Sequence, residues 1–112
     1  MKNISFIFIL LFCSFLIGSA YAENITGANI VNTDDDEPKI FFAAGTSLTI
    51  TNSATLSKSS GTKAVGIDNQ DNSTLTVHSG STVSTLAANG SDAVSATGQS
   101  GLTINNSGTI SA

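Results

Sequence analysis

Several residue types are rare or missing in this chain of 112 residues, and each absence excludes a way of building a fold or a site. The chain has no tryptophan, no arginine, one proline, one histidine and one cysteine, Cys13. One cysteine cannot close an intramolecular disulfide, and a structural zinc site usually takes four Cys or His ligands. Disulfides and structural zinc are therefore not expected to hold this fold together.

Positive charge is also scarce in the chain. Four lysines stand against eight acidic residues, which gives a net charge of −4. Proteins that bind nucleic acid use Lys and Arg to neutralise phosphates, and anionic membrane surfaces attract the same residue types. The charge balance therefore argues against nucleic acid and against an anionic membrane surface as partners.

The one long apolar run lies at the N-terminus. After Lys2, the segment from Ile4 to Gly18 is almost entirely apolar, and Ala20-Tyr21-Ala22 then has the small residues of a signal-peptidase site. We predict a signal peptide over residues 1–22, with Ala20 and Ala22 forming the cleavage site. The secretion machinery is then a partner, and no membrane span remains after cleavage. A membrane anchor or a buried core helix fits less well, because the run is short for a span of about 20 residues.

The rest of the chain contains one phrase three times at constant spacing, since 75 − 48 and 102 − 75 are both 27. Each copy reads leucine, threonine and an aliphatic residue, then a polar turn, then threonine, an aliphatic residue and serine. A fixed period of this size is typical of stacked repeats, and alternation of apolar and polar residues is typical of half-buried strands. The aliphatic positions are Leu48, Leu75 and Leu102, then Ile50, Val77 and Ile104, then Leu56, Val83 and Ile110.

We therefore predict an all-β fold: a parallel β-helix (solenoid) of about three rungs with a 27-residue period, after an N-terminal signal helix. The three sets of aliphatic residues would form three internal ladders, with rungs about 4.8 Å apart. A third strand in each rung is expected at residues 64–67 and 92–95. Residues 23–44 depart from the repeat and are predicted as an N-terminal capping segment. Residues 45–112 carry the repeats, which we expect to be incomplete, because Ala112 follows directly on a strand and repeat coils need capped ends.

A signal peptide followed by phrases such as the one from Gly101 to Ala112 resembles the start of a bacterial autotransporter passenger, a surface protein of type V secretion. The resemblance implies a parallel β-helix displayed outside a Gram-negative cell. It also implies a C-terminal β-barrel in the outer membrane, for which these 112 residues contain no segment. We therefore expect a passenger fragment that is exported to the periplasm, the cell surface or the medium.

Residues with catalytic chemistry are few. His78 is the only histidine, and the spacing places it in an outward ladder with Thr51 and Asn105, without a second ligand or base beside it. The oxygen-rich segment 34–37 could hold calcium but lacks a calcium-loop pattern, so we interpret it as a solvated loop. Segment 68–72 is interpreted as a corner loop. The sequence therefore predicts no catalytic residue, no cofactor and no metal.

These features favour one of three functions. The favoured prediction is a non-catalytic structural or adhesion module, whose surface contacts a host or other copies of itself. The alternative is a self-assembling extracellular fibre or biofilm subunit, because exposed strand edges template further pairing. A carbohydrate-active β-helix enzyme would need paired carboxylates along a groove, and the sequence offers no such pair.

Overall fold

The structure is a computed structural model that describes residues 22–58, 63–85 and 91–112. The predicted signal peptide, including Ala20, lies outside these residues except for its last position, Ala22. Every regular element in the described residues is a β-strand, as the sequence predicts. The strands are β1 (Glu23–Ile25), β2 (Ala28–Val31), β3 (Lys39–Phe41), β4 (Ser47–Ile50), β5 (Thr55–Lys58), β6 (Lys63–Gly66), β7 (Thr74–Val77), β8 (Thr82–Thr85), β9 (Asp92–Ser95), β10 (Thr103–Asn106) and β11 (Thr109–Ser111).

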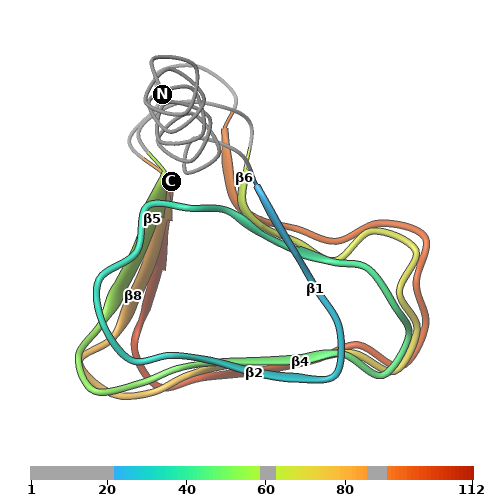
Figure 1. Ribbon diagram of the computed structural model, residues 1–112, viewed down its shortest axis with the longest axis horizontal. Coiled ribbons are helices and arrows are strands. Elements are labelled where there is room, and N and C mark those ends of the chain that lie inside the picture. Colours follow the sequence, from blue (N-terminus) through green and yellow to red (C-terminus); the bar gives the residue numbers. More distant parts are fainter. Residues whose placement is uncertain (1–21, 59–62, 86–90) are drawn as a thin grey trace, which may run out of the picture.

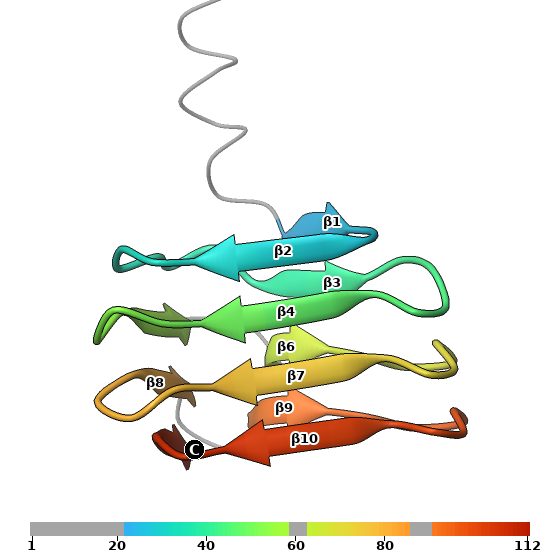
Figure 2. The same cartoon turned by 90° about the horizontal axis from the view of Figure 1, so that it is seen from below.

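The strands form three parallel sheets, and the chain visits the sheets in rotation. Sheet A has the order β1-β3-β6-β9, sheet B the order β2-β4-β7-β10, and sheet C the order β5-β8-β11. Asp35 extends sheet C by a single parallel bridge to Leu56. Figure 1 shows the three sheets around a common interior, and Figure 2 shows the strands of sheet B one above another. We call one passage through sheets A, B and C a circuit. The first circuit comprises β1, β2 and Asp35, and residues 23–44 therefore contribute β1, β2 and β3 to sheets A and B.

Side chains alternate between the interior and the surface, which explains why short segments of this composition form strands. In β4 and β7, the leucines and the aliphatic residues two positions later are buried, whereas the serine and threonines between them face outward. β4 pairs with β7 and β5 with β8 in the register that the repeat predicts, so Leu48 lies beside Leu75 and Leu56 beside Val83.

The third copy of the repeated phrase does not stack as its spacing predicts. The pairing of β10 with β7 is shifted by two positions from the constant period, so Ile104 lies beside Leu75, and Asn106 lies beside Val77. The predicted pairs of Leu75 with Leu102 and of Val77 with Ile104 are therefore wrong. A shift of two positions keeps the same side chains on the inner face, and Leu102 still packs against the core.

The corner between β10 and β11 compensates for this shift. The same shift of two positions is already present in the pairing of β9 with β6, where Val94 lies beside Val65. The corner of residues 107–108 is two positions shorter than the corner of residues 78–81 in the preceding circuit. Ile110 consequently lies beside Val83, in the register that the repeat predicts. Gly108 permits the tight corner, because a Cβ atom there would overlap the carbonyl oxygen of Ser81.

The core is an apolar column that runs through the circuits. The largest side chains with almost no exposed surface belong to Phe41, Leu48, Ile50, Leu56, Val65, Ile67, Leu75, Val77 and Val83. The last circuit closes the column less completely: Ile104 is 45% exposed, although it continues the column of Leu48 and Leu75. Burial of the column in the middle circuits supplies the main stabilisation of the fold.

Candidate functional site

The most unusual residue of the interior is a lysine. Lys39 lies in β3 and is 4% exposed, and it points inward because its neighbour in the alternation, Phe41, is also buried. In sheet A, Lys39 pairs with Glu23 and Phe41 with Ile25. The inner face of β3 therefore carries one charged and one aromatic side chain directly beneath the first circuit.

Carboxylates from two directions neutralise this lysine. The Nζ atom of Lys39 lies 2.5 Å from a carboxylate oxygen of Glu23, 2.7 Å from one of Asp35 and 3.9 Å from one of Glu37. Burial alone would lower the pKa of Lys39, but the hydrogen bonds to Asp35 and Glu23, together with their charges, outweigh burial and raise the pKa above its ordinary value of 10.5. The lysine is therefore protonated at neutral pH, and a protonated amine is not a nucleophile or a general base.

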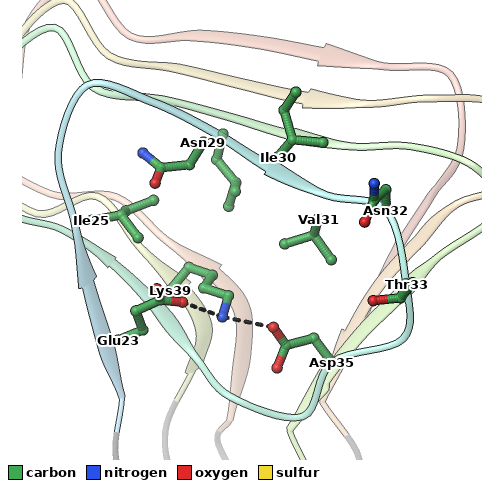
Figure 3. Close-up of a pocket in the computed structure, with 10 residues that line it drawn as sticks. Glu23, Ile25, Asn29, Ile30, Val31, Asn32, Thr33, Asp35 and Lys39 are labelled. Carbon is green, nitrogen blue, oxygen red and sulfur yellow. Dashed lines mark hydrogen bonds and ion pairs between the residues drawn. The ribbon is translucent and has the colours of Figure 1, made fainter.

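A cavity of about 150 Å³ opens beside this ion pair at the N-terminal end of the interior. Figure 3 shows the amine of Lys39 between Glu23 and Asp35, with Ile25 and Val31 across the same space. The lining residues are Glu23, Ile25, Asn29, Ile30, Val31, Asn32, Thr33, Asp35, Lys39 and Leu48. The cavity thus lies at the end of the apolar column, where β1 and β2 are the outermost strands of their sheets. Its lining is polar, and its charged side chains cover this end of the column.

A second charged cluster stabilises the corner that follows β6. Asp68 accepts a hydrogen bond from Nζ of Lys63 at 2.6 Å, and it accepts further bonds from Ser95 and Thr97 of the next circuit. The hydrogen bond from Lys63 is the main reason why the pKa of Asp68 lies below its ordinary value of 3.8, with the hydroxyl of Thr97 adding to the effect against partial burial. Asp71 likewise accepts the backbone N–H of Ser100 at 2.7 Å. Segment 68–72 is therefore a corner, as predicted, whose carboxylates tie two circuits together.

The predicted solvated loop at residues 34–37 is wrong for Asp35. Asp35 binds the buried Lys39 and accepts the backbone N–H of Glu37 at 2.8 Å. Asp34 is exposed, yet its carboxylate accepts the backbone N–H of Thr55 at 2.9 Å. In the part of the chain that the structure describes, no three His, Cys, Asp or Glu side chains are arranged to hold a metal ion.

The single histidine lies on the surface of the corner of residues 78–81, between β7 and β8. His78 is exposed, and its Nδ1 atom lies 3.0 Å from the hydroxyl of Thr51, the partner that the spacing predicts. Asn105, the predicted third member of this ladder, instead pairs with Thr76. Within the described residues, no hydrogen bond or ion pair joins the imidazole of His78 to a carboxylate or to a second base, so the geometry offers no catalytic pair there.

Sequence reasoning missed the buried Lys39 and its partner Glu23. The signal was present, because Lys39 and Phe41 are separated by the two-residue period of a strand, and Phe41 is a strong candidate for the inner face. Glu23 lies 16 positions from Lys39, a separation that does not occur in the repeat, so spacing alone could not pair them.

Comparison of the chain with protein-family profiles, with curated proteins and with solved structures finds no match. Within residues 22–58, 63–85 and 91–112, no helix has the length and apolar character needed to cross a bilayer.

Proposed function

We propose that this chain is a parallel β-helix of the autotransporter-passenger type, a non-catalytic structural or adhesion module of an exported protein. The observation that carries the proposal is the rotation of consecutive strands through three parallel sheets, with Leu48 stacked on Leu75 and Leu56 on Val83. A coil of this kind presents each corner of the repeat at regular spacing along its surface, which suits extended contacts with a host or with another copy.

The chemistry of the charged groups supports a structural role. Lys39 and Asp68 are the two titratable groups of the described residues with clearly shifted pKa values, and each shift favours the charged form through an ion pair. Catalytic acids and bases are instead tuned toward neutral pH, so that they can exchange a proton. These ion pairs therefore fit a cap and a corner brace better than an active site.

Export rests on the N-terminal sequence and is proposed with it. A signal peptide over residues 1–22, cut after Ala22, would deliver a chain that begins at Glu23, the first residue of β1. The folded part would then start directly at the processed terminus, in the periplasm or beyond it.

Expression of the full reading frame in a Gram-negative host tests the proposal. The expected result is a periplasmic, surface or extracellular product whose N-terminal residue is Glu23, and an Ala22→Arg variant should keep the leader and accumulate uncleaved. Arginine is unsuited to the small-residue site, whereas the matched variant Ala22→Gly should be processed normally. A wild-type product that remains in the cytoplasm with residues 1–22 attached would contradict export and the passenger proposal together.

A self-assembling fibre subunit is the second candidate, and a specific feature favours it. β9, β10 and β11 each lie at the end of their sheet, so their outer edges are unpaired within the described residues. Unpaired edges can template the addition of further strands. Concentration-dependent growth of fibres with a cross-β diffraction spacing near about 4.8 Å would favour this candidate over a discrete module.

A further inference from the structure

The circuit of β9, β10 and β11 divides its length between two connections in its own way. We call the segment that leads from sheet A to sheet B an A–B loop, and the segment that leads from sheet B to sheet C a B–C corner. Figure 2 shows the A–B loops on one side of sheet B and the B–C corners on the other. The A–B loops after β3, β6 and β9 are residues 42–46, 67–73 and 96–102, and the B–C corners after β4, β7 and β10 are residues 51–54, 78–81 and 107–108.

A slip of β10 by two positions would restore the connections of an earlier circuit. With β9 and β11 fixed, moving β10 from residues 103–106 to residues 101–104 leaves an A–B loop of residues 96–100 and a B–C corner of residues 105–108. These lengths are those of the A–B loop and the B–C corner on either side of β4. A slip of two positions also keeps the same side chains on the inner face of the sheet. The slipped register therefore uses connections that this fold already contains.

The sequence of residues 105–108 fits such a longer B–C corner. The corner after β4 contains an Asn-Ser pair in which both residues adopt positive φ, 59° at Asn52 and 56° at Ser53. Asparagine is among the non-glycine residues that adopt this conformation most readily. Residues 106–107 are also Asn-Ser, and after the slip they would occupy the positions of Asn52 and Ser53.

The inner face of sheet B would also gain from the slip. In the observed register, Asn106 occupies the column of Val77. After the slip, Leu102 would pair with Leu75 and Ile104 with Val77, so an aliphatic side chain would replace the asparagine in that column. Contact between aliphatic side chains in the interior is favourable, whereas a polar amide there is not.

A buried hydroxyl group gives independent support for the slipped register. Ser73 is fully buried, and within the described residues its Oγ atom has no hydrogen-bond partner. Because Thr103 pairs with Thr74, the residue that follows Ser73 in its column is Leu102, which cannot bond to a hydroxyl. After the slip Ser100 would take this place, and its own hydroxyl can satisfy that of Ser73. Leaving a buried hydroxyl unpaired is unfavourable, so the slip would relieve this cost.

Hydrogen bonds of the long A–B loop hold β10 in the observed register. The backbone N–H of Ser100 donates to the carboxylate of Asp71 at 2.7 Å, and the carbonyl oxygen of Ser100 accepts the N–H of Asn72 at 2.8 Å. The slip would carry Ser100 away from both partners and break both bonds. The A–B loop therefore opposes the slip that the B–C corner and the inner face favour.

We propose that β10 is a register switch, in which segment 96–108 exchanges between the observed register as the major state and a minor state slipped by two positions. The exchange transfers two residues from the A–B loop to the B–C corner and moves the outward side chains of Thr103 and Asn105 by about 6.6 Å along the strand direction. A surface that binds one arrangement of these side chains better than the other would select that register. The switch uses only the strands and connections of the coil, so it does not depend on export or adhesion.

Gly108→Ala is the variant that separates the two registers. In the observed corner, a Cβ atom at position 108 would overlap the carbonyl oxygens of His78 and Ser81. In the slipped corner, residue 108 would take the position of Ala54, a buried residue that carries a Cβ atom. The substitution should therefore make the slipped register the major one.

Disulfide closure in the full chain with Cys13 replaced by serine measures the register. Thr76→Cys with Asn105→Cys reports the observed register, and Thr76→Cys with Thr103→Cys reports the slipped one. With Gly108 retained, the first pair should close faster. The second pair should still close measurably faster than Thr49→Cys with Thr103→Cys, which β7 separates in either register.

Gly108→Ala should reverse the preference and change the ratio of the two closure rates by about 100-fold. Asp71→Ala should shift the ratio in the same direction by removing an anchor of the A–B loop, whereas the matched control Asp71→Asn keeps an oxygen acceptor and should shift it less. An unchanged preference in Gly108→Ala, or the loss of both closures in it, would refute the switch. Closure between positions 76 and 103 at only the rate of positions 49 and 103 would refute it as well.

Discussion

The ion pair inside the N-terminal end predicts an asymmetry between its two sides. The side chain of Lys39 is 5% exposed, whereas those of Asp35 and Glu23 are 29% and 50% exposed. Lys39→Met removes the buried charge and leaves two carboxylates that water can reach. Asp35→Asn leaves the ammonium group buried with the half-exposed Glu23 at 2.5 Å and with Glu37 no closer than 3.9 Å. The side-chain oxygen that accepts the backbone N–H of Glu37 is retained.

The magnitudes follow from where the uncompensated charge remains. Removing one partner of a fully buried ion pair costs about 3–5 kcal/mol, because the other charge is stranded, whereas an exposed pair contributes about 0–1 kcal/mol. Since Glu23 still pairs with Lys39, Asp35→Asn should lower the free energy of unfolding by about 2 kcal/mol. Lys39→Met should lower it by about 1 kcal/mol or less, because the methionine fills the space of the lysine stem.

Urea unfolding followed by far-ultraviolet circular dichroism measures both changes, and no tryptophan is required. The exchange rate of the Phe42 amide, which donates to the carbonyl of Ile25 at 2.9 Å, reports on the first circuit by itself. Asp36→Asn, at an exposed neighbour, is the control and should change stability by less than about 0.5 kcal/mol. A loss for Lys39→Met that equals or exceeds the loss for Asp35→Asn would refute the reasoning.

Three further predictions concern pH and the last corner. The raised pKa of Lys39 means that its contribution to stability is complete below about pH 10.5 and is lost as the pH rises through the higher folded-state value, so the urea midpoint should fall more steeply there than in Lys39→Met. The lowered pKa of Asp68 has the opposite sign: its contribution is present above about pH 3.8 and is lost as the pH falls through the folded-state value, and an acid titration of Asp68→Asn should lack this step. Because the side chain of Asp68 is 30% exposed, the step should amount to about 1 kcal/mol or less. Gly108→Ala should lower the thermal midpoint clearly, because the new Cβ would overlap the carbonyl oxygen of Ser81, whereas Ser107→Ala should have little effect; equal midpoints for the two variants would argue against the tight corner.

Much of the fold could be predicted because the same alternation of apolar and polar residues recurs along the chain. The apolar positions at Leu48, Leu75 and Leu56 identified the inner faces of strands. The third strands, predicted at residues 64–67 and 92–95, form at Lys63–Gly66 and Asp92–Ser95. The register of β10 could not be predicted from the same pattern. The copy beginning at Leu102 matches the earlier copies in sequence, but the lengths of the corners decide which residues of two strands pair. The chain before β9 is two residues longer than the constant period requires, so β9 and β10 are both shifted. The shorter corner at residues 107–108 removes this shift before β11.

The charged groups were harder to predict for a related physical reason. Lys39 is separated from Glu23 by a circuit of non-repeating length, and Asp68 contacts Thr97 across a sequence separation two positions longer than the period. A repeat pattern identifies partners at the constant period alone. The ion pairs of Lys39 and Asp68 both occur where the period changes, at the first circuit and at the corner after β6.

Paired cysteines in sheet B test the stacking of successive circuits most directly. In a chain with Cys13 replaced by serine, Thr49→Cys with Thr76→Cys and Thr76→Cys with Asn105→Cys join residues that face each other in the register of β4, β7 and β10. Strands in one sheet lie about 4.8 Å apart, which is within the Cα separation that a disulfide spans. We predict rapid intramolecular disulfide formation in both pairs and much slower formation for Thr76→Cys with Thr103→Cys, the pair at the constant period. Failure of the pair at positions 49 and 76 to close would contradict the parallel stack itself, and preferential closure between positions 76 and 103 would contradict the shifted last circuit.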